Sequence, residues 1–192
     1  MGYAGVMHHV NTVHTRHFPF VLCFGRAKGI FAKIFAELAR PTGPVADVLM
    51  IDAPRLIGRT KGGMNSKLHA VGDGAGRPIR LHLTAGQRSD FKGADVLLPS
   101  RPPVKVLIAD RGYESAKVRK TDEGRHVKAC IPSRKNRKEP IPFCKATHKK
   151  CHKVENLFAK LKDWRRIAMR YDRYAHTFLS AIYIAAIVIF WL

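Results

Sequence analysis

Acidic residues are scarce in this chain: 14 Asp and Glu stand against 35 Lys and Arg, which gives a formal net charge of +21 and a pI of about 10.4. This balance excludes a preference for cationic partners and makes polyanions, with nucleic acid first, the expected partners. The charge is not confined to a tail, because 22 of the 35 basic residues lie between Arg101 and Arg173. A ribosomal or otherwise merely cationic protein would explain the charge equally well.

Cysteine is also scarce. This number and spacing exclude a disulfide-stapled mini-domain and are typical of a protein from a reducing cytosol. Cys144, His148, Cys151 and His152 could be read as a zinc cluster, but their spacing matches no common zinc finger, so incidental residues are the favoured interpretation. The four cysteines are Cys23, Cys130, Cys144 and Cys151.

No hydrophobic run reaches the length of a conventional transmembrane helix. The most apolar stretch, residues 178–192, falls short of the roughly 20 residues needed to span a bilayer, which favours a buried helix that packs on the sheet or in an oligomer interface. The first residues also show no apolar core of a signal peptide. We therefore expect a cytoplasmic protein without stable membrane association.

Short apolar and periodic segments alternate along the chain and predict an α/β fold. Three strands that pair antiparallel are expected to lead into parallel ones, and Asp73-Gly74-Ala75-Gly76 is a hairpin signal. In order, the predicted elements are a helix over 27–39, strands over 45–52, 66–73 and 77–84, a helix over 94–98, a strand over 104–110, a helix over 115–124, a strand over 127–131, a loop over 133–150 and a long helix from 152 to about 168.

Two of the apolar strands end in an aspartate, Asp52 and Asp110, and Glu155 lies near the start of the basic amphipathic helix. Functional groups gather at the carboxyl ends of strands in α/β sheets, so these carboxylates are expected to converge. Three carboxylates suit a pair of divalent cations acting on a phosphodiester. At 100° per residue, Lys162 and Arg166 share a helix face with Glu155; without the aspartates, a solvated charged face would be the better interpretation.

Several longer strings resemble the DDE transposases of bacterial insertion sequences, in family order and over roughly residues 26–192. The resemblance implies a ribonuclease H-like mixed sheet flanked by helices, with a long C-terminal helical segment. It also implies metal-dependent cleavage and joining of DNA strands at the element's ends, with two Mg²⁺ ions. The strings are GRTKGGMNSKLH at 58–69, LTAGQRSD at 83–90, IADRGY at 108–113, IPSRKNR at 131–137 and NLFAKLKDWRRIA at 156–168.

Position by position, the resemblance makes Asp52 and Asp110 the catalytic, metal-binding aspartates and Glu155 the matching glutamate. Lys162 matches a downstream lysine that contacts DNA, and Arg166 is a further candidate for a phosphate contact. The implied partner is double-stranded DNA, both element ends and target, which predicts association with the nucleoid; whether the chain works as a homodimer stays open. The basic loop is either a DNA clamp or a solvated charge run, and its candidates are Arg134, Lys135 and Arg137.

Three departures from the family pattern predict a truncated copy with weak or no activity. The segment between Asp52 and the string at 58–69 is short, His148 and Cys151 replace a tyrosine and an arginine, and most of an N-terminal DNA-binding region is missing. We accordingly divide the chain into an irregular stretch at 1–25, a helix remnant with linker at 26–44 and a catalytic domain at 45–192.

Two rival functions stay open. A non-catalytic DNA-binding relic of a transposase would explain the charge and the departures, and metal-dependent nicking distinguishes it. A ribonuclease H-like nuclease without strand transfer is the second rival, which an assay with pre-cut ends separates. A membrane-associated basic protein is a more distant third.

Overall fold

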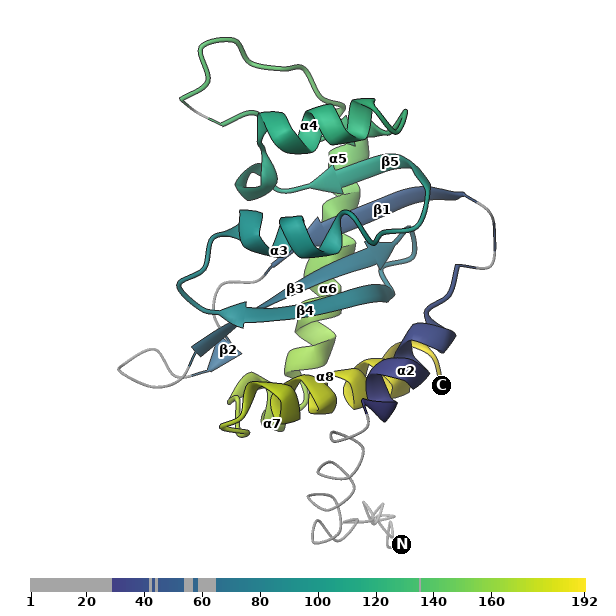
Figure 1. Ribbon diagram of the computed structural model, residues 1–192, viewed down its shortest axis with the longest axis vertical. Coiled ribbons are helices and arrows are strands. Elements are labelled where there is room, and N and C mark those ends of the chain that lie inside the picture. Colours follow the sequence, from purple (N-terminus) through teal and green to yellow (C-terminus); the bar gives the residue numbers. More distant parts are fainter. Residues whose placement is uncertain (1–28, 42, 44, 54–56, 59–64, 135) are drawn as a thin grey trace, which may run out of the picture.

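The computed structural model describes residues 29–41, 43, 45–53, 57–58, 65–134 and 136–192. A mixed sheet lies at the centre, with α3 and α4 on one face and α6 crossing the other (Figure 1). The strands are β1 (Ala46–Asp52), β2 (Ile57–Gly58), β3 (Asn65–Asp73), β4 (Pro78–Ala85), β5 (Val104–Ala109) and β6 (Lys128–Cys130). The helices are α2 (Ile30–Leu38), α3 (Asp90–Leu97), α4 (Ala116–Glu123), α5 (Lys145–His148), α6 (His152–Lys162), α7 (Arg165–Ala168) and α8 (Ala175–Phe190), with short 3₁₀ turns η1 (Arg111–Tyr113) and η2 (Lys149–Cys151).

β1 is the central strand of the sheet. It pairs antiparallel with β3 and parallel with β5, and the spatial order is β4-β3-β1-β5-β6, with β2 pairing the start of β3. The side chains of Leu49, Met50 and Ile51 are fully buried, because this strand has helices over both faces. The predicted α/β class and the change from antiparallel to parallel pairing are confirmed.

The hairpin between β3 and β4 follows from its turn residues. The Asp73 carboxylate accepts hydrogen bonds from the backbone N–H groups of Ala75 and Arg77, both at 2.9 Å, and Gly76 has a φ of 88°. Glycine adopts this left-handed conformation without steric cost, whereas a side chain at Gly76 would also contact Lys153 at 3.1 Å. The predicted hairpin is confirmed.

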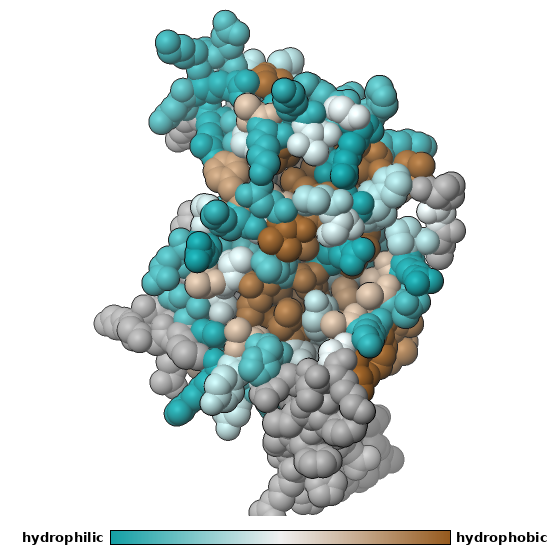
Figure 2. All heavy atoms as spheres, in the orientation of Figure 1, coloured by the Kyte–Doolittle hydropathy of each residue, from teal (hydrophilic) through white to brown (hydrophobic). Residues whose placement is uncertain are grey.

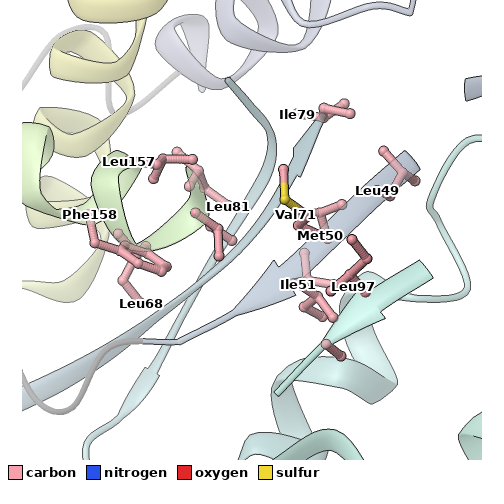
Figure 3. Close-up of a cluster of buried hydrophobic side chains, with 14 of the residues drawn as sticks. Leu49, Met50, Ile51, Leu68, Val71, Ile79, Leu81, Leu97, Leu157 and Phe158 are labelled. Atoms are coloured by element: carbon pink, nitrogen blue, oxygen red, sulfur yellow. The ribbon is translucent and has the colours of Figure 1, made fainter. Parts of the chain in front are cut away.

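The hydrophobic core joins the sheet to helices from distant parts of the sequence. Figure 3 shows apolar side chains of β1, β3 and β4 meeting Leu157 and Phe158 of α6 and Leu97 of α3. Val154 and Leu161 of α6 are also buried, as the apolar stripe of this helix predicts. This packing holds α6 across the sheet and so determines where its charged face, with Glu155 and Lys162, lies.

The C-terminal helix α8 packs inside the fold. It contacts α2, β4, α6 and α7, and the rings of Phe35 and Tyr183 lie 5.1 Å apart. The Tyr183 hydroxyl donates a hydrogen bond to the Leu81 carbonyl at 3.4 Å. The prediction that residues 178–192 pack on the sheet is thus confirmed. Among the described residues, no helix has the length and hydropathy that crossing a bilayer requires.

Three predicted boundaries are wrong. α3 begins at Asp90 rather than at residue 94, and the predicted loop over 133–150 becomes helical at Lys145. The predicted long helix breaks at Trp164, whose backbone is extended with φ −79° and ψ 104°. The apolar pattern missed this break because Leu161, Trp164 and Ala168 recur at helical spacing across it, and Trp164 still packs against the core. Arg166 therefore does not share a helix with Glu155.

Candidate active site

Asp52 and Asp110 leave neighbouring strands at the same edge of the sheet. β1 and β5 run parallel with Ile51 opposite Ala109, so the aspartates that follow these residues lie side by side. Asp52 is half-buried at the end of β1, while Asp110 is exposed and begins the turn η1, where its carbonyl accepts a hydrogen bond from Tyr113 N–H at 2.9 Å. The predicted position of both residues at strand ends agrees with the structure.

Glu155 reaches the same region from the first turn of α6. Burial raises the pKa of Asp52 from 3.8 to about 6, and repulsion from Asp110, Glu155 and Asp90 adds to this effect, while a 2.7 Å hydrogen bond from Ala53 N–H opposes it. These four acids thus lie within each other's electrostatic reach around Asp52. Repulsion among carboxylates in so basic a chain marks the surroundings of Asp52 as a candidate functional site.

Asp90 was not among the predicted site residues. It is the first residue of α3, and its Oδ1 accepts a hydrogen bond from Lys67 Nζ at 2.9 Å. Its carboxylate also lies against Gly112, where a Cβ atom would stand 2.7 Å from Asp90 Oδ2. A side chain at Gly112 would therefore require the Asp90 carboxylate to move. The sequence did contain a signal that could have identified Asp90. It ends the family-like string at 83–90, and its partner Lys67 lies in the family-like string at 58–69.

A buried polar cluster supports the turn that follows Asp110. The ring nitrogens of the fully buried His69 lie 3.2 Å from Tyr113 Oη and 3.0 Å from Thr84 Oγ1. Burial lowers the pKa of His69 to about 4, so the imidazole is neutral and can donate through one nitrogen while accepting through the other. Gly93 packs on this ring, since a Cβ there would stand 2.2 Å from Nδ1.

His148 and Cys151, the two departures from the family pattern, line the carboxylate region. His148 Nε2 lies 3.3 Å from the Ala109 carbonyl oxygen, directly before Asp110. Cys151 is buried, and burial together with the negative charges of Asp52, Asp110 and Glu155 raises the pKa of its thiol to about 12. A neutral thiol therefore stands where an arginine would counter the charge of the carboxylates.

The predicted DNA-contact residues have different surroundings. Lys162 is exposed at the last residue of α6, whereas the Arg166 guanidinium donates hydrogen bonds to both carboxylate oxygens of Asp172, at 2.6 and 2.9 Å. Arg134 lies over the ring of Phe91, 4.6 Å from its centroid. Lys135 lies outside the described residues. Arg166 is thus committed to an internal ion pair, while Lys162 is exposed to solvent.

A buried glutamate organises the basic loop, and sequence reasoning missed it. Glu114 is 4% exposed and is paired with Arg119 at 3.4 Å, with Arg134 at 4.0 Å and, at shorter range, with Arg137. Hydrophilic side chains cover this end of the molecule, around α4 and the loop above it (Figure 2). Glu114 follows η1 directly, so it ties the loop to the turn that carries Asp110.

The donor chemistry of the site fits a divalent cation of the Mg²⁺ type. Asp52, Asp110 and Glu155 offer oxygen donors. The pKa of Asp52 is raised mainly by burial and further by the neighbouring acids, whose negative charge such a cation would neutralise. In the described ranges, no group of three or more His, Cys, Asp or Glu side chains is already arranged to hold a metal ion. Coordination by all three carboxylates therefore requires their side chains to turn toward the ion.

The sheet order, with parallel β1 and β5 ending in carboxylates, defines a ribonuclease H-like fold. A chain in the cryo-EM structure of a simian T-cell lymphotropic virus intasome, in complex with PP2A regulatory subunit B56 gamma, shares this fold. The two superpose with a TM-score of 0.50 and 11% sequence identity, over 78% of this chain and 50% of that chain. This similarity concerns the fold alone.

The sequence identifies the family within this fold. Residues 50–191 match the family described as the transposase DDE domain, and the chain belongs to that family. The transposase named for insertion sequence element IS6501 of Brucella ovis is 33% identical over 131 residues, which are 67% of this chain and 99% of that protein. The transposase named for insertion sequence element IS402 of Burkholderia cepacia is 27% identical over 195 residues, covering 88% of this chain and 89% of that protein.

Proposed function

We propose that this protein is a transposase that cuts DNA strands at the ends of an insertion sequence and joins them to target DNA. The observation that supports the proposal is that Asp52 and Asp110 follow neighbouring parallel strands, while Glu155 on α6 lies within electrostatic reach of Asp52. We assign these three carboxylates as the catalytic and metal-binding residues.

Each of these residues contributes differently to the site. Bound Mg²⁺, expected as two ions, supplies activation of the attacking oxygen and neutralisation of the phosphate charge. Asp52 is held in orientation by the Ala53 N–H bond and must be ionised to act as a ligand, which its pKa of about 6 permits at neutral pH. Lys67 pairs with Asp90 and so offsets part of the surrounding negative charge.

Basic residues on both sides of the carboxylates are proposed to bind the DNA backbone. Lys162 contributes from α6, and Arg134 and Arg137 contribute from the loop that Glu114 holds in place. Contacts of this kind position the duplex without reading its sequence. Affinity should therefore be largely electrostatic and fall steeply with salt, and the same property favours association with the nucleoid.

The alternative of a non-catalytic DNA-binding relic draws on one specific observation. The buried Cys151 leaves the carboxylates without the cation that the family pattern predicts beside them. In that case the protein binds DNA through its basic residues but does not cleave it. A nuclease without strand transfer would cleave but leave pre-cut ends unjoined.

The test is a cleavage and strand-transfer assay in Mg²⁺ on DNA carrying the inverted repeats that flank the element. Asp52→Asn, Asp110→Asn and Glu155→Gln should each abolish nicking while leaving DNA binding intact. Asp47→Asn is the matched control. Asp47 also lies in β1, at the opposite end from Asp52, and its 81% exposed side chain forms an ion pair with Lys105. Nicking that survives all three substitutions, or that is lost equally in the control, would refute the assignment.

A further inference from the structure

The turn between α7 and α8 presents two tyrosine rings to solvent. Tyr171 is 76% exposed and Tyr174 is 69% exposed, which places both among the most exposed large apolar side chains in the described part of the chain. Exposed rings of this size lose favourable burial unless they serve contact with a partner. Neither ring takes part in the site described above.

The turn is built so that Tyr171 is held outward. Tyr171 N–H donates a hydrogen bond to the Arg166 carbonyl at 3.1 Å, and the Arg166 guanidinium lies 5.5 Å from the centroid of its ring. That guanidinium is fixed in turn by both oxygens of Asp172, which is 8% exposed. The ring is therefore preorganised by an ion pair beneath it, which lowers the entropic cost of binding.

Tyr174 is held in a similar way. Its ring stacks on His176 with centroids 5.7 Å apart and an interplanar angle of 29°. Next to it, the guanidinium of Arg170 lies over the ring of Phe178, 5.8 Å from the centroid. The turn thus carries two supported rings within a segment rich in arginine, a combination that suits a nucleobase next to a phosphate.

The turn lies beside the short strand β2. α7 contacts β2, which follows Asp52 along the chain, and Figure 1 shows α7 near β2, below the sheet. Lys162, Arg165 and Arg173 lie exposed around the turn. A second copy of the chain would bring like charges together here, so a polyanion is the partner that matches the surface.

We propose that Tyr171 and Tyr174 form a stacking surface for unpaired bases of DNA, on the part of the molecule where α7 meets β2. The ligand class is a single-stranded extension or an unstacked end, whose bases lie on the rings while its phosphates meet the surrounding arginines. The inference rests on the proposed function for DNA as the ligand. It adds to that function a preference for unpaired over fully paired ends.

The experiment compares two labelled DNA probes by fluorescence anisotropy in EDTA, so that no cleavage occurs. One probe is a blunt duplex, and the other is the same duplex with a short single-stranded 3′ extension. Tyr171→Ala and Tyr174→Ala should each weaken binding of the extended probe by about 5- to 100-fold and leave the blunt probe within about twofold. Tyr171→Phe and Tyr174→Phe should keep the wild-type preference, because they retain the ring.

Arg173→Gln is the matched control. It removes an exposed cation from the same turn and should weaken both probes by the same factor, with a shallower salt dependence. A 2-aminopurine base in the extension should lose fluorescence on binding to wild type but not to the alanine variants. Equal effects of the tyrosine variants on both probes, or a change in oligomeric mass on sedimentation, would overturn the proposal. Because no cleavage is measured, this result is independent of whether the carboxylate variants abolish nicking.

Discussion

The substitution Asp52→Asn should stabilise the metal-free protein while it abolishes cleavage. Asp52 is half-buried and lies near Asp110, Glu155 and Asp90, so burial and the neighbouring charges disfavour its ionised form in the folded chain. Asparagine keeps the shape and can still accept the Ala53 N–H bond, but it carries no charge. The substitution therefore removes the free-energy penalty of keeping Asp52 ionised in the folded state, and it loses few favourable contacts.

The magnitude follows from the pKa. A folded-state pKa of about 6 against an ordinary value of 3.8 corresponds to a penalty of up to about 3 kcal/mol at pH 8, and to about 1–2 kcal/mol once partial exposure and screening by solvent are allowed for. Between these values the folded state binds more protons than the unfolded state. Stability of the wild type should therefore fall as pH rises from about 4 through about 6, and then level off.

The assay is urea denaturation in EDTA at pH 8 and at pH 4, followed by circular dichroism. Asp52→Asn should gain about 1–2 kcal/mol over wild type at pH 8 and little at pH 4. The control Asp47→Asn should show no gain, because Lys105 lowers the pKa of that exposed carboxylate. Adding Mg²⁺ should raise the stability of wild type more than that of Asp52→Asn. The reasoning would be refuted if Asp52→Asn were less stable than wild type, or if its gain in unfolding free energy were the same at pH 4 and pH 8.

Three further predictions concern residues around the carboxylates. Gly93→Ala should cost about 1–3 kcal/mol in urea denaturation, because its Cβ would overlap the ring of His69, and wild-type stability would contradict this. Glu114→Gln should cost about 2–3 kcal/mol and speed tryptic cleavage in the basic loop, since it breaks a buried ion-pair cluster; unchanged proteolysis would show that the loop is held otherwise. The double change His148→Tyr with Cys151→Arg should raise Mg²⁺-dependent nicking by about 10–100-fold, and full activity of the unmodified chain would show that these residues are no defect.

The boundaries of every strand except the short β2, to within one residue, and the placement of two carboxylates were accessible from sequence alone. β1 and β5 read as apolar runs because both faces of a central strand are buried, and the residue that ends such a run stands at the edge of the sheet. The buried stripe of α6 and the packing of α8 were likewise visible, since burial of one helix face imposes a period of 3.6 residues.

The tertiary structure alone decided which distant groups meet. The sequence around Glu114 does not indicate that arginines from α4 and from the basic loop pair with it. Asp90 likewise approaches Gly112 only because α3 packs beside η1. The break at Trp164 was hidden because helical periodicity continues across it, and it moved Arg166 from the face of Glu155 to a pair with Asp172. Periodicity records which residues are buried within a segment, whereas the partner of a charge depends on how segments pack, and a single sequence does not encode that locally.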